Sequence, residues 1–142
     1  MRIVFDTNVL LSAPFFQSGL SSAVLNHTLA TYDLIISDWI LDEFVTKLNS
    51  PDFRKKNRNY RFDEATVQQL TTFVQQAFTI VTPTNALPTL CRDSDDNHIL
   101  QLAGFVGADY LITGDKDLLV LDLYNSCRIV SPKTFAQVVG LS

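Results

Sequence analysis

The sequence predicts an α/β protein, a three-layer α/β/α arrangement around a mostly parallel central sheet. Three observations support this class. Short runs of apolar, often β-branched residues alternate with segments of helical periodicity along the chain. The connections are long enough for right-handed βαβ crossovers, which join parallel strands. The length of 142 residues is close to the commonest size of one domain, so we expect residues 1–142 to form a single domain.

The N-terminal part of the chain is expected to contain two strands and three helices. Val9, Leu10 and Leu11 mark the inner side of the first helix, Gly19 marks a break after it, and a serine is available as N-cap of the second helix. The predicted elements are, in order, a strand at 2–5, a helix at 7–13, a helix from 21 or 22 to about 30, a strand at 34–36 and a helix at 38–48.

The C-terminal part continues the alternation. Val67 and Val74 belong to one apolar helical stripe, two prolines mark a loop before residue 96, and Pro132 suits the first turn of a last helix. The predicted elements are, in order, a helix at 63–77, a strand at 78–81, a helix at 96–106, a strand at 110–113, a helix at 116–121, a strand at 128–130 and a helix at 132–139.

Composition narrows the possible partners and locations. The net charge of −4 and the pI near 4.9 argue against a broad basic surface that coats nucleic acid. Cys91 and Cys127 are far apart and form no C-x-x-C pair, so neither a zinc site nor a redox motif is indicated. No apolar run of about 18 residues occurs, and no stretch of signal-peptide length precedes Asp6. We therefore expect a cytoplasmic protein with no membrane partner.

Four acidic residues stand where a parallel sheet would gather them at one edge. Asp6 and Asp115 follow short apolar runs, Asp96 opens a helical pattern, and Glu43 lies near the start of a helix that follows another run. The carboxyl ends of parallel strands share one edge of the sheet, so side chains more than a hundred positions apart can meet there. The sequence thus predicts a cluster of carboxylates.

Such a cluster is suited to a divalent metal ion. Hard ions such as Mg²⁺ and Mn²⁺ prefer carboxylate and water oxygens, and the sequence has no histidine pair at ligand spacing. Crowding carboxylates without a cation is costly because like charges repel. Sites of this kind commonly serve phosphoryl chemistry, in which two ions hold the entering and leaving oxygens together. We expect Mg²⁺ or Mn²⁺ as cofactor.

These motifs resemble the PIN-domain ribonucleases over nearly the whole chain. V-F-D-T-N-V-L is similar to the motif of the first acid, with Asp6 as a metal ligand and Asn8 as its hydrogen-bonding supporter. L-D-E-F supplies Glu43 as the second acid, on the helix after the second strand. D-D-N-H-I-L-Q-L-A supplies Asp96 as the third. Each fragment is weak alone, but their order and strand context together are specific.

The last motif of the resemblance is L-I-T-G-D-K-D-L-L. Thr113 supports the site there, and Asp115 or Asp117 is the fourth acid; Asp115 is preferred because it is nearer the strand end. Helix register also leaves a choice among Asp93, Asp95 and Asp96 for the third ligand. The resemblance implies a PIN-like fold and catalysis by Asp6, Glu43, Asp96 and Asp115.

Within this family the chain is most similar to toxin components of bacterial and archaeal toxin–antitoxin systems. The resemblance implies an RNA substrate and a protein antitoxin that covers the acidic edge. It also suggests a homodimer, for which Phe15, Leu20 and Trp39 are candidate contacts.

A basic segment interrupts the acidic chain between two predicted helices. It holds five of the eleven basic residues, beside Phe53, Tyr60 and Phe62, and is the best candidate for contacting phosphates and stacking a base. The alternative is a solvated loop. The basic residues are Arg54, Lys55, Lys56, Arg58 and Arg61.

Other interpretations compete with the metal site. Asp96 could only cap a helix, Asp115 could only stabilise a turn, and Glu43 could only pair with Lys47 four positions on. His98 could contact substrate or be an ordinary surface histidine. At the level of the whole chain, the rival to a nuclease is a non-catalytic PIN-like module that binds RNA or protein.

Overall fold

In the part of the chain that the structure describes, six strands form one sheet in the order β3-β2-β1-β4-β6-β5, with all pairs parallel except the antiparallel β5–β6 pair. The computed structural model describes residues 1–12, 19–56 and 63–141. The mostly parallel sheet confirms the predicted α/β class. The strand bounds are β1 Arg2–Phe5, β2 Asp33–Ser37, β3 Thr79–Val81, β4 Tyr110–Ile112, β5 Leu123–Tyr124 and β6 Cys127–Val130.

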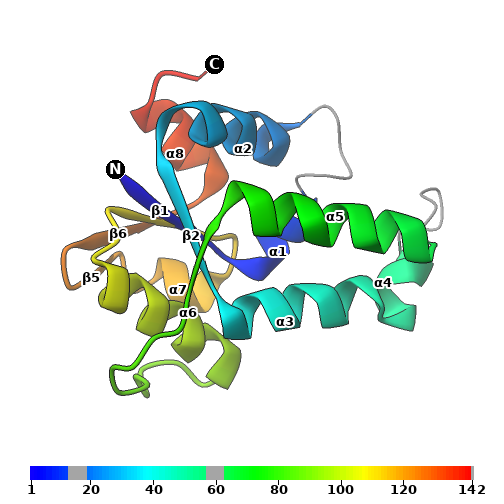
Figure 1. Cartoon of the computed structure of the whole chain (residues 1–142). Coiled ribbons are helices and arrows are strands. Elements are labelled where there is room, and N and C mark those ends of the chain that lie inside the picture. The colour runs from blue at the N-terminus through cyan, green and yellow to red at the C-terminus, as the bar shows by residue number, and fades with distance from the viewer. Residues whose placement is uncertain (13–18, 57–62, 142) are drawn as a thin grey trace.

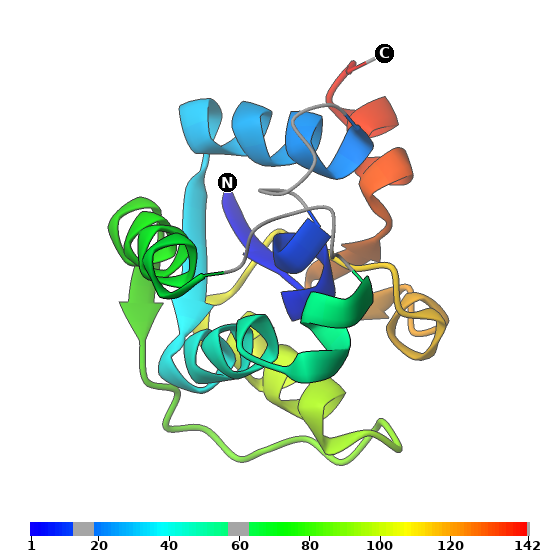
Figure 2. The same cartoon turned by 90° about the vertical axis from the view of Figure 1, so that its right-hand side faces the viewer.

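Helices cover both faces of this sheet. Figure 1 shows α2, α5 and α8 on one side and α6 on the other, and Figure 2 gives the view turned by 90°. α3 follows β2 and contacts α1, α5 and α6. The helix bounds are α1 Thr7–Ser12, α2 Leu20–Thr31, α3 Asp38–Leu48, α4 Pro51–Lys56, α5 Glu64–Ala77, α6 Ser94–Val106, α7 Lys116–Leu119 and α8 Pro132–Val138.

The strand order creates a switch point between β1 and β4. The chain moves outward in one direction from β1 to β2 and β3, and α6 then carries it back to β4 on the other side of β1. Connections leave the carboxyl ends of β1 and β4 in opposite directions, which opens a crevice in sheets of this type. Phe5 and Ile112 are partners in register, so the residues that follow them, Asp6 and Thr113, start side by side at this crevice.

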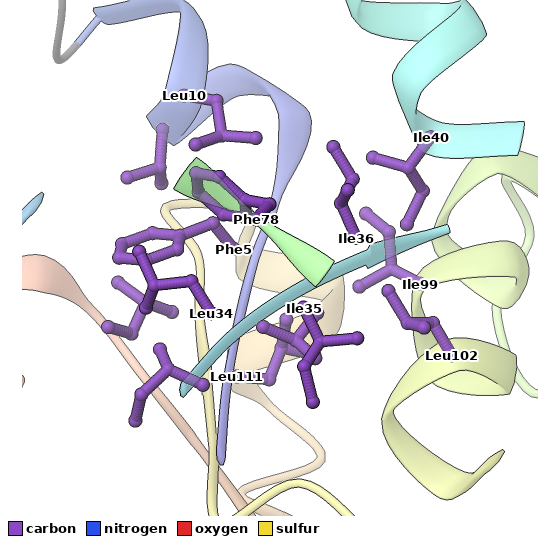
Figure 3. Close-up of a cluster of buried hydrophobic side chains, with 14 of the residues drawn as sticks. Phe5, Leu10, Leu34, Ile35, Ile36, Ile40, Phe78, Ile99, Leu102 and Leu111 are labelled. Carbon is purple, nitrogen blue, oxygen red and sulfur yellow. The ribbon is translucent and has the colours of Figure 1, made fainter. Parts of the chain in front are cut away.

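Apolar residues of the strands and helices hold the sheet in place. Figure 3 shows Phe5, Leu10 and Phe78 on one side of the strands, and Ile99 and Leu102 of α6 on the other. The Phe5 and Phe78 rings meet edge to face, with centroids 6.2 Å apart. Such packing on both faces explains why the central strands are continuous apolar runs and do not alternate with polar residues.

Side-chain caps fix the starts of the helices that lie near the crevice. Ser37 accepts a hydrogen bond from the Ile40 backbone N–H at the start of α3, and Asp93 accepts one from the Asp95 N–H at the start of α6. Gly107 ends α6 in the left-handed conformation (φ 61°), which glycine adopts without the strain of a side chain. The polar residues that open these helices are thus held at defined positions.

Two elements differ from the sequence-based expectation. The segment that begins the basic stretch forms α4, not a plain interruption between helices, and Ser50 accepts a hydrogen bond from the Phe53 N–H at its start. The two-residue strand β5, which pairs antiparallel with β6, was not predicted because it is too short to give a periodicity signal. Phe15, Arg58, Tyr60, Arg61 and Phe62 lie outside the described residues.

None of the helices in the described ranges is long and apolar enough to cross a membrane. Cys127 is buried and Cys91 half-buried, and both are free thiols.

Candidate metal centre

The ends of β1 and β4 bring Asp6 and Thr113 into direct contact. The Thr113 hydroxyl donates to Asp6 Oδ2 over 2.7 Å, and the Asp115 backbone N–H donates to the Thr113 oxygen over 3.0 Å. Asp6 is 4% exposed and Thr113 is fully buried. The Asp6 N–H continues the sheet by donating to the Ile112 carbonyl over 2.9 Å. A buried hydroxyl thus joins the first and last predicted motifs.

Asp96 lies at the third position of α6 and points into the same region. Because Asp93 caps this helix, Asp96 is not needed as its cap, and its carboxylate is 5% exposed. Oxygens of Asp96, Asp115 and Asp117 all lie within 4.8 Å of one another. This group, which we call the aspartate triad, joins one residue of α6 to two residues at the start of α7.

The electrostatics of the triad favour a cation. Burial raises the pKa of Asp96 to about 7, and the charge of Asp115, the hydrogen bond with it and the charge of Asp6 add to this effect. Asp96 Oδ2 is buried and has no hydrogen-bond partner among the described residues. A buried carboxylate oxygen without a partner is costly in a folded protein. The oxygen-only donor set and the unpartnered atom fit a hard divalent ion such as Mg²⁺ or Mn²⁺.

Asp6 is part of the same electrostatic environment. Burial raises its pKa, whereas the hydrogen bonds from the Thr113 hydroxyl and the Asn8 backbone N–H, and the charge of Lys47, lower it; the charge of Asp115 raises it. Asn8 therefore supports Asp6 through its main chain. The Asn8 side chain instead accepts a hydrogen bond from Lys47 Nζ over 3.4 Å.

Glu43 lies outside the aspartate triad. Its side chain is 12% exposed, and Glu43 Oε1 forms an ion pair with Lys47 Nζ over 3.4 Å. Burial raises the pKa of Glu43, the Thr7 hydroxyl and Lys47 lower it, and Asp95 raises it. The pairing with Lys47 is present as sequence spacing suggests, and Lys47 connects Glu43 to Asn8.

Asp115 has two roles in this geometry. Its side chain caps α7 by accepting from the Asp117 N–H over 2.8 Å, which is the turn-stabilising role considered from sequence. Its carboxylate also belongs to the triad, so capping and clustering coexist. Asp117, expected only as a supporter or as an alternative to Asp115, lies in the triad as well.

The described part of the basic segment lies on α4. Arg54, Lys55 and Lys56 are exposed in its last turn, and Arg54 Nη2 donates to Asn49 Oδ1 over 3.2 Å. Arg58 and Arg61 lie outside the described residues. The basic side chains of α4 are therefore accessible to a polyanion in solution.

Two aromatic residues near the acids pack against each other. The rings of Trp39 on α3 and His98 on α6 are stacked, with centroids 3.8 Å apart and planes 9° from parallel. Both residues are half-buried. Trp39 therefore packs within the chain. His98 is not an ordinary exposed histidine, and it makes no hydrogen bond to an acidic side chain among the described residues.

Thr7 and the contact of Lys47 with Asn8 were not predicted from the sequence. Thr7 is fully buried, and its hydroxyl interacts with Glu43 and lowers the pKa of that carboxyl. Lys47 touches both Glu43 and Asn8. The D-T-N motif and the four-residue spacing from Glu43 to Lys47 are the sequence signals for these residues. Neither signal shows that α1 and α3 pack together.

Comparison with known proteins places the chain in a family. Residues 2–117 match the family model of the PIN domain. The chain belongs to the PIN-domain family. An uncharacterized protein of Methanocaldococcus jannaschii is 33% identical to this PIN-domain chain over 148 residues, which cover 96% of the chain and 90% of the relative.

Solved structures share the fold of this PIN domain. One match is the crystal structure of VapBC2 from Rickettsia felis bound to a DNA fragment from its promoter. It has a TM-score of 0.66 and 14% identity, and the match covers 92% of this chain and 98% of that chain. PAE2754 of Pyrobaculum aerophilum matches with a TM-score of 0.63 and 17% identity, covering 100% of this chain and 91% of that chain. These likenesses show the PIN-like fold.

Proposed function

We propose that this PIN domain is a metal-dependent endoribonuclease that hydrolyses RNA phosphodiester bonds. The observation that carries the proposal is the buried, unpartnered Asp96 oxygen in a triad of aspartates beside Asp6. Carboxylates gathered at the switch point of a parallel sheet, in a PIN-domain chain, are best explained by Mg²⁺ or Mn²⁺. Asp6, Glu43, Asp96 and Asp115 are the proposed ligands and catalytic residues, with Asp117 in support.

The chain's own residues would prepare this site for phosphodiester hydrolysis. When bound, the divalent ion would supply an activated water and offset the charge that builds up at phosphorus. The Thr113 hydroxyl donates to Asp6, and this bond and the one from the Asn8 N–H lower the Asp6 pKa against the larger effect of burial. Lys47 restrains Glu43 through their ion pair. The residues are thus fixed before substrate arrives, which lowers the cost of binding the transition state.

The α4 basic residues are proposed to contact the RNA backbone. Lys55 and Lys56 are exposed cations on a chain whose net charge is −4, so they offer phosphate a local attractive surface that the protein as a whole lacks. We propose the same phosphate-contacting role for Arg54, Arg58 and Arg61, which belong to the same basic segment of the sequence.

Cleavage of RNA by the purified protein tests the proposal. We expect degradation of a labelled RNA with Mg²⁺ or Mn²⁺, no degradation in excess EDTA, and a loss of at least about a hundredfold in Asp6→Asn. Asp109→Asn is a matched control, because Asp109 is an exposed aspartate at the opposite ends of the strands. Equal cleavage by wild type and Asp6→Asn would contradict the assignment.

We further propose that the enzyme acts in the cytoplasm as the toxin of a toxin–antitoxin pair, as a homodimer held by a protein antitoxin. Support comes from the structural likeness to VapBC2 and from the resemblance of the sequence motifs. Expression of wild type should arrest growth, expression of Asp6→Asn should not, and co-expression of the neighbouring gene product should relieve the arrest. Normal growth with active enzyme present would refute the toxin role and leave the nuclease role standing.

The second candidate function is a non-catalytic module that binds RNA or protein. It is favoured by one observation, the pairing of Glu43 with Lys47 outside the triad, which leaves fewer acids free for metal. Calorimetric titration with Mn²⁺ separates the two. A nuclease should give saturable heat that is lost in Asp96→Asn, whereas a module without a metal site should give none.

A further inference from the structure

A pocket opens directly beside the candidate metal centre. Its volume is about 360 Å³, and we call it the serine pocket. It lies between α1, the turn after β4 and the first turns of α2 and α8. Residues that line it include Asn8, Ser12, Ser21, Gly114, Asp115 and Pro132.

The serine pocket is continuous with the acids. Asp115 belongs both to this wall and to the aspartate triad, and Asn8 belongs both to this wall and to the Lys47 contact. A nucleic-acid strand whose phosphate lies at the triad would therefore place the adjoining nucleoside in the serine pocket.

The chemistry of the wall suits an uncharged polar ligand. Asp115 is the one charged residue among the described wall residues, and the other polar groups are an amide and two hydroxyls. Ser12 donates to the Val9 carbonyl over 2.9 Å, so its oxygen remains able to accept. The Ser21 hydroxyl makes no hydrogen bond to another described residue, so it can donate or accept. No basic side chain among the described wall residues would attract a second phosphate.

Size and access also agree with one sugar and base. Pockets that bind small molecules start at about 300 Å³, so 360 Å³ corresponds to a single nucleoside and not to a longer stretch of RNA. A Cβ added at Gly114 would meet no atom within 4 Å, so the backbone there borders open space. Pro132 contributes an apolar surface against which a flat ring can pack.

We propose that the serine pocket binds the nucleoside adjoining the scissile phosphate, and that Ser21, Ser12 and Asn8 discriminate among bases. The proposal rests on the ribonuclease function proposed above. Neutral hydrogen-bonding side chains read the edges of unpaired bases in single-stranded RNA. The acids would then determine that a bond is cut, and the serine pocket would determine next to which nucleotide.

Filling the pocket without touching the acids tests the proposal. Ser21→Leu places a branched side chain in the wall, and Ser22→Leu is the matched control because Ser22 is equally half-buried on the same turn but does not line the pocket. With a short RNA, we expect Ser21→Leu to raise KM about tenfold and to change the preferred cleavage positions. Ser22→Leu should match wild type. Wild-type KM and cleavage positions in Ser21→Leu would overturn the proposal.

A second measurement separates failure of the pocket from failure of the nuclease function. The four free ribonucleosides, which carry no phosphate for the metal centre, are titrated into ¹⁵N-labelled wild type. We expect shifts of the Ser12, Ser21 and Gly114 amides that favour one base and disappear in Ser21→Leu. If Ser21→Leu does not fold, Gly114→Val, which projects into open space, takes its place. Absence of these shifts would overturn the pocket even if RNA is cleaved, and their presence would support it even if RNA is not.

Discussion

Thr113 and Asp6, 107 positions apart in the chain, are joined by a buried hydrogen bond of 2.7 Å. This bond joins the residues that follow β1 and β4, and the same hydroxyl also accepts from the Asp115 N–H. One buried side chain thus positions two of the proposed metal ligands.

Removing the Thr113 hydroxyl should therefore weaken both folding and metal binding. In Thr113→Val, Asp6 keeps its burial but loses a hydrogen bond, which should lower the free energy of unfolding by about 1–3 kcal/mol. Urea denaturation measures the stability, and Mn²⁺ calorimetry should show weaker binding. Thr113→Ser, which keeps the hydroxyl, should retain the Mn²⁺ affinity; similar losses of affinity in both variants would contradict this role.

Stability of the metal-free protein should fall as pH rises from about 4 to about 7. The pKa of Asp96 is about 7 in the fold, against an ordinary 3.8, so the folded state holds this proton more tightly than the unfolded state does. Its contribution is fully present below pH 3.8 and is lost as pH rises through 7. Raised pKa values of Asp6 and Glu43 act in the same direction.

Urea denaturation in EDTA at several pH values measures this slope. Asp96→Asn, which cannot ionise, should have a shallower slope than wild type between pH 5 and 8, and Mg²⁺ should restore the stability of wild type at pH 8. An unchanged slope in Asp96→Asn would show that Asp96 is not the titrating group.

Lys47 should compete with a metal ion for the acids. Its Nζ lies 3.4 Å from Glu43 Oε1, and its charge lowers the pKa of both Asp6 and Glu43. Lys47→Met removes a positive charge from the site, so Mn²⁺ affinity at pH 8 should rise about threefold to tenfold. Lys47→Arg keeps the charge and should behave as wild type. Weaker Mn²⁺ binding by Lys47→Met would mean that Lys47 organises the site more than it opposes the ion.

The α4 basic residues should govern the salt dependence of RNA binding. Replacing Lys55 and Lys56 by Gln should weaken binding of a single-stranded RNA and reduce the slope of log affinity against log salt by about one. The matched control replaces Arg128 and Lys133, two exposed cations on β6 and α8. Filter binding at several salt concentrations gives the slopes; equal slopes in the two double variants would exclude α4 as the RNA contact.

The stacked rings of Trp39 and His98 should couple α3 to α6. The centroid distance of 3.8 Å predicts an interaction of about 0.5–1.5 kcal/mol in a double-mutant cycle with Trp39→Ala and His98→Ala. Circular dichroism during urea denaturation measures the four stabilities. His27, on α2 beside Tyr32, is the control, since His27→Ala should be additive with Trp39→Ala.

The sequence predicts the central part of the fold because each of its elements carries a strong local signal. Parallel strands such as β1 and β4 are apolar runs, and α3 and α5 have clear apolar stripes and polar caps. α4 was missed because its six residues bury none of their side chains, so they leave no periodic pattern. β5 has only two residues and depends on pairing with β6.

The candidate site is predictable in part for similar reasons. Asp6 and Thr113 could be placed because they directly follow apolar strands, and Asp115 comes two residues after Thr113. The choice among Asp93, Asp95 and Asp96 depends on helix register, and only the folded chain shows that Asp93 caps α6 and that Asp96 is buried. The contacts of Lys47 with Asn8 and of Thr7 with Glu43 depend on how α1 packs against α3, and no local pattern encodes that packing.

The wide separation of the acids along the chain has a consequence for synthesis of the protein. Asp6 leaves the ribosome 107 residues before its partner Thr113, and the carboxylates of Asp115 and Asp117 emerge only after β4 has been translated. A nascent chain that stops before this point lacks both the strand beside β1 and two members of the triad. The acidic edge therefore cannot form until β4 and the residues that follow it have been translated, which separates the synthesis of β1 from the onset of any chemistry at this edge.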